Sequence, residues 1–230
     1  MIKEPALGGI KGIERLNILT DFKNFLFDSN SNATNKLGKK NFLLLLIFEF
    51  IIVAIISTLI IMLGIQNLDY RSVDLGSTAI LIIFNAVILA PVAEEFIFRY
   101  HQKLSIQRLI ISFTFALAIF YSSLWRLVVF GLYIVGWSLL FKFKVPVSRR
   151  LIVFSSALLF ALFHLAHFND IAVFPTYIFV AVLILPQFFT ALILSFIFWN
   201  YGLVYSICFH MAWNLLVILP KLLILMFLQV

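Results

Sequence analysis

The chain has 230 residues, of which 63% are hydrophobic and only 12% are charged. Soluble domains carry about 25% charged residues, so this composition excludes an ordinary soluble domain. The net charge of +7 comes without a recognisable nucleic-acid motif, so we expect no nucleic-acid partner. Apolar runs of roughly 20 residues recur, the length a helix needs to cross a bilayer. The sequence therefore predicts an all-α, polytopic transmembrane helical bundle.

Residues 1–40 form a polar tail that contains one amphipathic pattern. Apolar residues recur at steps of three or four between residues 10 and 26, with charged residues between them. This periodicity is typical of an amphipathic helix. Such a helix either lies in the membrane interface or packs on the protein's own cytoplasmic face. We expect an N-terminal amphipathic interfacial helix, with the second position kept as the alternative, and a linker at residues 28–41.

Seven apolar segments follow within residues 41–230, which we interpret as one transmembrane domain. They are predicted to be helices, because a backbone inside lipid must satisfy its own hydrogen bonds. Residues 221–230 either extend the last span as a Pro-kinked helix or lie along the interface, which gives seven or eight spans. The predicted spans are 42–65, 77–102, 109–123, 127–141, 151–167, 173–200 and 203–220.

Basic residues predict the orientation of these spans. They gather in the tail before the first span, after the second and in the loop after the fourth, whereas the opposite side has few. Cytoplasmic loops carry an excess of Lys and Arg, so the N-terminus is predicted to be cytoplasmic. The richness in Phe, Ile, Leu, Asn and Lys suggests an AT-rich bacterial genome, and hence a bacterial inner membrane.

Three acids fall within the predicted spans, where a charge costs at least about 2.5–3.5 kcal/mol. Glu49 has no evident partner, and it either contacts another helix or marks a pathway. Glu95 and Arg99 lie four residues apart in the favourable order for an ion pair. Glu94 lies about 100° around the helix and can point into the bundle without a counter-ion, as a general base would. Alternatively, both glutamates only mark the cytoplasmic end of the second span.

Two further apolar segments carry polar side chains that suit hydrolytic chemistry. His164 follows a long apolar run, and His210 and Asn214 share one face of the last span. Each group taken alone is explained by hydrogen bonding between helices. Together with Glu94 they provide a base, two imidazoles and an amide, which can activate water and stabilise an oxyanion.

These residues also form three motifs in order: EExxxR at 94–99, FxxxH at 160–164 and HxxxN at 210–214. In this order on apolar helices, they resemble the CPBP (Abi) intramembrane proteases. That group includes CAAX prenyl endopeptidases of the Rce1 type and bacteriocin-immunity relatives. The resemblance implies that Glu94 activates water with help from His164. It also implies that Glu95 and Arg99 support the site, and that His210 and Asn214 form the oxyanion hole.

The resemblance leaves the cofactor and the substrate open. Glu94, His164 and His210 would make a His₂Glu set of the kind that binds catalytic zinc, but no HExxH pair is present. We expect no tightly bound metal. The expected partner is a membrane-embedded or lipid-linked peptide substrate. The interval between Arg99 and His164 is long for the family, so the spans near 109–141 are interpreted as an inserted hairpin.

Two other functions remain as alternatives. A non-enzymatic immunity or partner protein would use the same fold, with the motif residues serving only as helix contacts. A small transporter is disfavoured, because no inverted repeat and no matching pair of Gly/Pro-broken spans is found.

Overall fold

The computed structural model describes residues 18–27, 37–62, 81, 83–167 and 177–228. All regular structure in these residues is helical, which confirms the all-α prediction. The α-helices are α1 (Ile18–Phe27), α2 (Lys39–Met62), α4 (Ala90–Phe98), α5 (Ile106–Phe120), α6 (Leu124–Lys142), α7 (Arg149–His164), α8 (Tyr177–Tyr201) and α9 (Leu203–Leu228). A π-helix precedes α4 (Phe84–Leu89), and single 3₁₀ turns follow α4 (Tyr100–Gln102) and α7 (Leu165–His167).

The helices match the predicted spans where both are described, and the chain is an integral membrane protein. Within the residues that the structure describes, four helices are long and apolar enough to cross a membrane, namely Lys39–Met62, Leu124–Lys142, Val180–Tyr201 and Leu203–Pro220. α5 is apolar but shorter. The second predicted span takes the form of the π-helix followed by α4. Beyond Pro220 the chain stays helical to Leu228, so the tail extends the last span. The total of seven or eight spans stays a prediction, and the start of the sixth lies outside the described residues.

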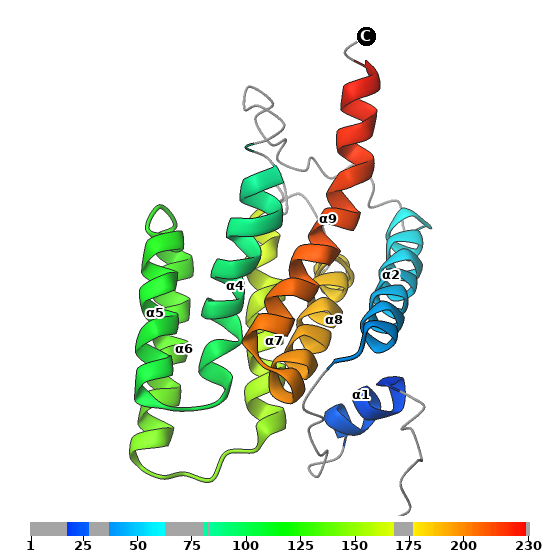
Figure 1. Ribbon diagram of the computed structural model, residues 1–230. Helices are drawn as coiled ribbons and strands as arrows, with labels where there is room; N and C mark the ends of the chain where they lie inside the picture. Colours follow the sequence, from blue (N-terminus) through cyan, green and yellow to red (C-terminus); the bar gives the residue numbers. More distant parts are fainter. Residues whose placement is uncertain (1–17, 28–36, 63–80, 82, 168–176, 229–230) are drawn as a thin grey trace, which may run out of the picture.

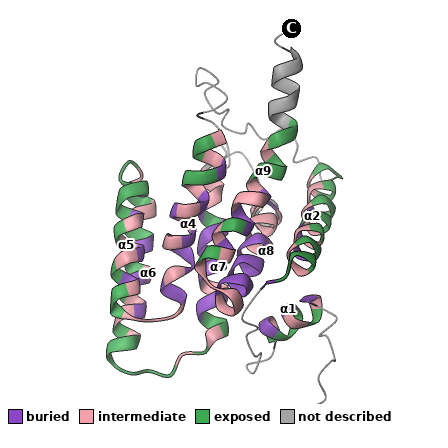
Figure 2. Ribbon diagram, in the orientation of Figure 1, coloured by how far each residue is buried: buried purple, intermediate pink, exposed green. Residues whose placement is uncertain are grey.

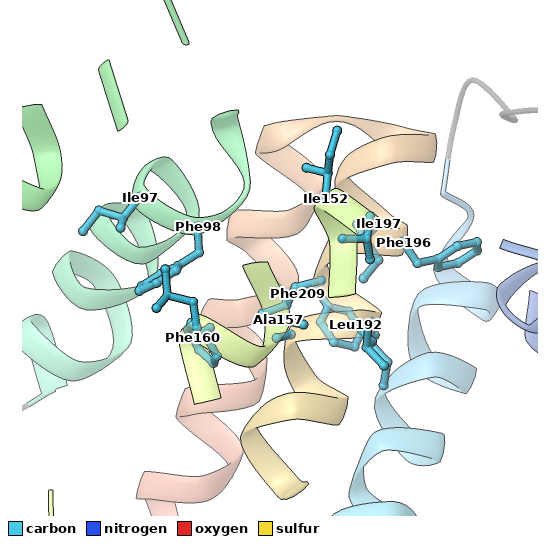
Figure 3. Packing of buried hydrophobic residues seen from close by; sticks show 14 of the residues in the cluster. Ile97, Phe98, Ile152, Ala157, Phe160, Leu192, Phe196, Ile197 and Phe209 are labelled. Atoms are coloured by element: carbon cyan, nitrogen blue, oxygen red, sulfur yellow. The ribbon is translucent and has the colours of Figure 1, made fainter. Parts of the chain in front are cut away.

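α8 is the central helix of the bundle. Residues 190–198 are all buried, and a helix that is apolar all round belongs in a core. Buried residues concentrate on α4, α7 and α8, whereas α2, α5 and α6 show mostly exposed faces (Figure 2). Figure 3 shows buried side chains of α7, α8 and α9 together, among them Ile152, Ile197 and Phe209. Phe196 points away from them and meets the Phe22 and Phe25 rings of α1. The exposed Leu, Ile and Val side chains of the outer helices suit a lipid surrounding.

α1 packs its apolar face on the protein. Ile18, Phe22 and Phe25 are buried, and the Phe22 ring lies edge-on to Phe196 of α8 at 5.5 Å between centroids. The guanidinium of Arg149 donates a hydrogen bond to the Phe25 carbonyl at 3.1 Å. These contacts correspond to the alternative position considered for this helix. Its location in the membrane interface stays a prediction, and residues 10–17 of the pattern lie outside the described part.

Three chain segments lie at one end of the bundle: α1, the link from α4 to α5, and the link from α6 to α7 (Figure 1). These are segments in which the sequence gathers Lys and Arg. A common end is what the positive-inside rule requires of cytoplasmic segments. Assignment of this end to the cytoplasm stays a prediction.

Candidate active site

Pro91 sets the start of α4 and frees one backbone carbonyl. The N–H of Ala90 bonds to the carbonyl of Asn85, five residues earlier, in the π-helix that precedes it. The next bond in this register would run from residue 91 to Ala86, but proline has no N–H. The Ala86 carbonyl instead accepts a hydrogen bond from Asn214 Nδ2 of α9 at 2.8 Å. This bond ties the motif helix α9 to the beginning of α4.

Side chains also satisfy the carbonyls at the C-terminal end of α4. The last carbonyls of any helix have no backbone N–H partner within that helix. The carbonyls of Phe96, Ile97 and Phe98 accept hydrogen bonds from side chains of the 3₁₀ turn after α4, of α5 and of α7. The donors are Ser112, His101, Gln102 and Ser156. Because both ends are held, the rotation of α4, and with it the direction of Glu94 and Glu95, is fixed.

Gly202 brings α9 back along α8. Its φ of +98° lies in the left-handed region that favours glycine, and its N–H bonds to the carbonyls of Ile197 and Phe198. α9 begins at the next residue, so its first turns pass beside α4 and α8 (Figure 1). Ser206 and His210, four residues apart, therefore share the face that meets Glu95.

Glu95 is fully buried and lies at the centre of a polar cluster. His210 Nδ1 lies 2.9 Å from Glu95 Oε1, and the Ser206 hydroxyl donates to Oε2. Arg99 NH1 lies 3.4 Å from Oε1, so the structure contains the ion pair that the spacing predicts. An ionised carboxylate only accepts hydrogen bonds, so His210 Nδ1 carries a proton. The buried charge of Glu95 is thus compensated from its own helix and from α9.

Glu94 faces the opposite side of the same imidazole. Its Oε2 lies 3.6 Å from His210 Nε2, and its side chain is 24% exposed. The sequence predicted no counter-ion for Glu94, and the structure provides a histidine rather than a Lys or Arg. His210 therefore lies between two carboxylates. Glu95 is fully buried and held by hydrogen-bond donors, whereas Glu94 is partly exposed.

His164 joins the cluster from the end of α7. Its Nδ1 lies 2.9 Å from the Phe160 carbonyl, and since a carbonyl only accepts, Nδ1 is the protonated nitrogen. A neutral imidazole in this tautomer leaves Nε2 as a proton acceptor. The His164 ring meets the Phe160 ring, which also meets the His210 ring.

The Phe160 ring connects the motif residues physically. Its centroid lies 4.3 Å from the His164 ring and 6.2 Å from the His210 ring. The Arg99 guanidinium stacks over it at 4.3 Å, a cation–π contact. Figure 3 shows Phe160 beside Phe98 of α4, with ring centroids 5.2 Å apart. One aromatic side chain thus separates Arg99 from the two imidazoles and keeps their spacing.

The structure therefore brings together Glu94, Glu95, Arg99, His164 and His210 from three helices. Asn214 lies one turn further along α9, with one of its two amide hydrogens directed to Ala86. The sequence analysis missed Ser206, and it included Phe160 in a motif without giving it a role. Both stand four residues before a motif histidine, so helical periodicity contained the signal.

The geometry does not favour the His₂Glu metal set. Among the residues that the structure describes, no three His, Cys, Asp or Glu side chains are placed to hold a metal ion. We therefore derive no chemical step through a metal.

The comparison with known proteins covers the same helices. A family model for the type II CAAX prenyl endopeptidase Rce1-like proteins matches residues 76–216. This range includes all three motifs and more than half of the chain. No curated protein and no solved structure matches the chain.

Proposed function

The chain belongs to the Rce1-like family of type II CAAX prenyl endopeptidases, and on that premise we propose that it is an intramembrane endopeptidase. It hydrolyses a peptide bond of a membrane-associated substrate with a water molecule activated by Glu94. The observation that carries this proposal is the position of His210 between the accessible Glu94 and the buried Glu95.

The proposed reaction assigns different tasks to the two carboxylates. Glu94 takes a proton from water, whose oxygen attacks the carbonyl carbon of the scissile bond. The tetrahedral intermediate collapses when the C–N bond breaks, and Glu94 returns the proton to the leaving nitrogen. Glu95, fixed by Ser206 and Arg99, holds His210 in one orientation. His164, with Nε2 as its acceptor, assists Glu94 in orienting the water.

Two α9 side chains are the proposed oxyanion donors. A protonated His210 carries a hydrogen on Nε2, on the side where Glu94 lies. Asn214 retains a second amide hydrogen beside the one bonded to Ala86. Donors aimed at a developing oxyanion usually account for the largest single share of catalysis in acyl transfer.

The proposed substrate is a membrane-embedded or lipid-linked peptide, and a prenylated peptide is the case that the family suggests. The site lies on helices of an integral membrane protein, and Glu94 is its accessible acid. We place the protein in a bacterial inner membrane, with its N-terminus in the cytoplasm. The gathering of basic residues supports this orientation.

A cleavage assay with the purified protein tests the proposal. Glu94→Gln keeps the shape of the side chain but removes the base, so we expect cleavage of a farnesylated CAAX peptide to fall by about 10²–10⁴-fold. The melting temperature should not change, because Glu94 is partly exposed. Thr114→Val is the matched control, since this exposed hydroxyl bonds only to Ile110 of its own helix.

The outcomes separate the enzyme from its alternative. Cleavage by the wild type and the control, but not by Glu94→Gln, supports the enzyme. Absence of cleavage by the wild type, with Glu94→Gln lowering the melting temperature, favours a non-enzymatic immunity or partner protein. Repeating the assay with a chelator measures dependence on a metal.

A further inference from the structure

Gln102 is a buried amide that the proposed reaction does not use. It stands in the 3₁₀ turn after α4, three residues beyond Arg99, and is 0% exposed. Its Nε2 donates to the Phe98 carbonyl at 3.1 Å and to Ser195 Oγ of α8 at 2.9 Å. Trp199 Nε1 of α8 donates to its Oε1 at 3.1 Å. Both amide hydrogens and the carbonyl oxygen of this side chain are therefore engaged.

The partners of Gln102 allow only one orientation of its amide. An indole N–H only donates and a backbone carbonyl only accepts, so Oε1 faces Trp199 and Nε2 faces Phe98. The amide thereby joins the last turn of α4 to two residues of α8 that lie one helical turn apart, Ser195 and Trp199. A side chain that lacks either the two donors or the acceptor cannot make these three bonds.

α8 is bonded to the candidate active site at the neighbouring residue as well. The hydroxyl of Ser206, which donates to Glu95 Oε2, also lies 3.1 Å from the carbonyl oxygen of Leu194. Leu194 and Ser195 are consecutive residues of α8, and both are fully buried. α4 and α9 are thus held against the same turn of the central helix, α4 through Gln102 and α9 through Ser206.

The backbone closes these bonds into a ring. The N–H of Gln102 donates to the Arg99 carbonyl at 2.9 Å, and the N–H of Arg99 donates to the Glu95 carbonyl at 3.0 Å. The ring therefore runs from the Glu95 side chain to α9, then to α8, and returns through the Gln102 amide to the Glu95 backbone. Hydrogen bonds in such an interior are stronger than in water, because the local dielectric is low. The residues of the ring are at most 1% exposed, namely Glu95, Arg99, Gln102, Leu194, Ser195 and Ser206.

We propose that Gln102 is a positioning residue, which fixes the Glu95 carboxylate by closing a ring of hydrogen bonds through α4, α8 and α9. Loss of the amide opens the ring, so that α4 can shift relative to α8 while Ser206 stays bonded to α8. The Glu95 carboxylate then moves relative to Nδ1 of His210, and Nε2 of the same imidazole moves relative to Glu94. The inference rests on the proposed function.

The experiment measures the kinetics and the unfolding of full-length variants, with the farnesylated CAAX peptide as substrate. Gln102→Met keeps an unbranched side chain of similar size and removes the amide. Ser195→Ala removes only the acceptor on α8, and it replaces Gln102→Met if the latter does not fold. Asn200→Leu is the matched control, because this amide of α8 donates to the Phe196 carbonyl of its own helix at 2.8 Å.

The expected kinetic result for Gln102→Met is a kcat lowered by about tenfold, which corresponds to about 1.4 kcal/mol in the activation barrier. KM should not change, since the buried Gln102 is not accessible to a substrate. The pH profile of kcat should be displaced, whereas a purely structural loss would lower the melting temperature without moving this profile. Ser195→Ala should give the same changes to a smaller degree, and Asn200→Leu none.

A double-mutant cycle tests the ring itself. Gln102→Met and Ser206→Ala remove bonds to adjacent residues of α8, so their effects on the free energy of unfolding should be non-additive. In the control cycle, Thr58→Val replaces Ser206→Ala. The Thr58 hydroxyl is exposed on α2 and bonds to Ala54 of its own helix, so this cycle should be additive.

Additive effects of Gln102→Met and Ser206→Ala overturn the ring. Coupled stabilities with an unchanged kcat and pH profile overturn the positioning role, as does an equal loss of kcat in Asn200→Leu. If the wild type cleaves no peptide, the proposed function fails and the positioning role fails with it. The ring is then decided by the stability cycle alone, so the two failures are distinguishable.

Discussion

The α4–α9 pair and the α5–α6 hairpin use their polar side chains differently. In the first, polar groups bond across helices, as in Glu95 with His210, and Asn214 with Ala86 of the π-helix that leads into α4. In the hairpin, Thr114 and Ser138 bond to carbonyls four residues earlier in their own helices. The hairpin helices also show large exposed apolar faces, whereas the facing sides of α4 and α9 are buried (Figure 2).

The difference shows what fixes the position of a helix inside lipid. Lipid is as apolar as leucine, so burying an apolar face gives little preference for one rotation of a helix. The hairpin is attached mainly by ring packing, such as Phe98 of α4 against Phe120 and Phe130. Ser112 adds a polar contact to the end of α4, and Tyr133 adds contacts to His101 of the following 3₁₀ turn and to Ser155 of α7. Hydrogen bonds between helices are directional, so they fix the rotation of each helix about its own axis. A catalytic site needs this, because the rotation sets the direction of each catalytic side chain.

The largest expected contrast in stability is between two arginines. Arg99→Met leaves Glu95 buried without its cation, so we expect the free energy of unfolding to fall by about 3–5 kcal/mol. Arg126→Met in the hairpin removes a partly exposed cation that bonds to Ser123, and should cost less than about 1 kcal/mol. Thermal unfolding in detergent measures both. Similar losses for the two variants would contradict the contrast between the regions.

A smaller contrast is expected between two serines. Ser206→Ala removes a donor to the buried Glu95 carboxylate, and hydrogen bonds to charged groups contribute about 1.5–3 kcal/mol. Ser138→Ala removes only a bond within α6, so its effect should lie within about 0.5 kcal/mol. Unfolding curves of the two variants, recorded together, make the comparison. If Ser138→Ala were the more damaging change, the hairpin would depend on polar bonding after all.

The smallest expected stability effect is at Asn214. Asn214→Ala removes the bond to Ala86, and such bonds between membrane helices average about 0.6 kcal/mol. As an oxyanion donor, however, the residue should matter about 10²–10³-fold for kcat. Kinetics and unfolding of one sample separate these two roles. A large fall in stability with unchanged kcat would leave Asn214 as a helix contact only.

Some contacts of the site could be predicted from the sequence, and others could not. The Glu95–Arg99 pair was predictable because both residues stand on one helix, where spacing alone makes them neighbours. Thr190 as partner of Glu49 was not, since 141 positions separate them and only the packing of α2 on α8 joins them. Glu94 and His210 were expected in one site, but not which carboxylate each nitrogen of the His210 imidazole would face. His210 was recognised as a candidate, but its direction depends on the turn at Gly202.

The sequence by itself determined the membrane class, the helical nature of the apolar segments and the residues that carry the three motifs. Hydrophobic length and backbone satisfaction leave an apolar run of this kind only one regular structure in lipid. The tertiary structure alone decided which carboxylate is sealed and which is accessible, and which imidazole nitrogen faces each of them. These features depend on the rotation and crossing of separate helices. That rotation is fixed by contacts between distant residues, such as Asn214 with the carbonyl that Pro91 leaves free.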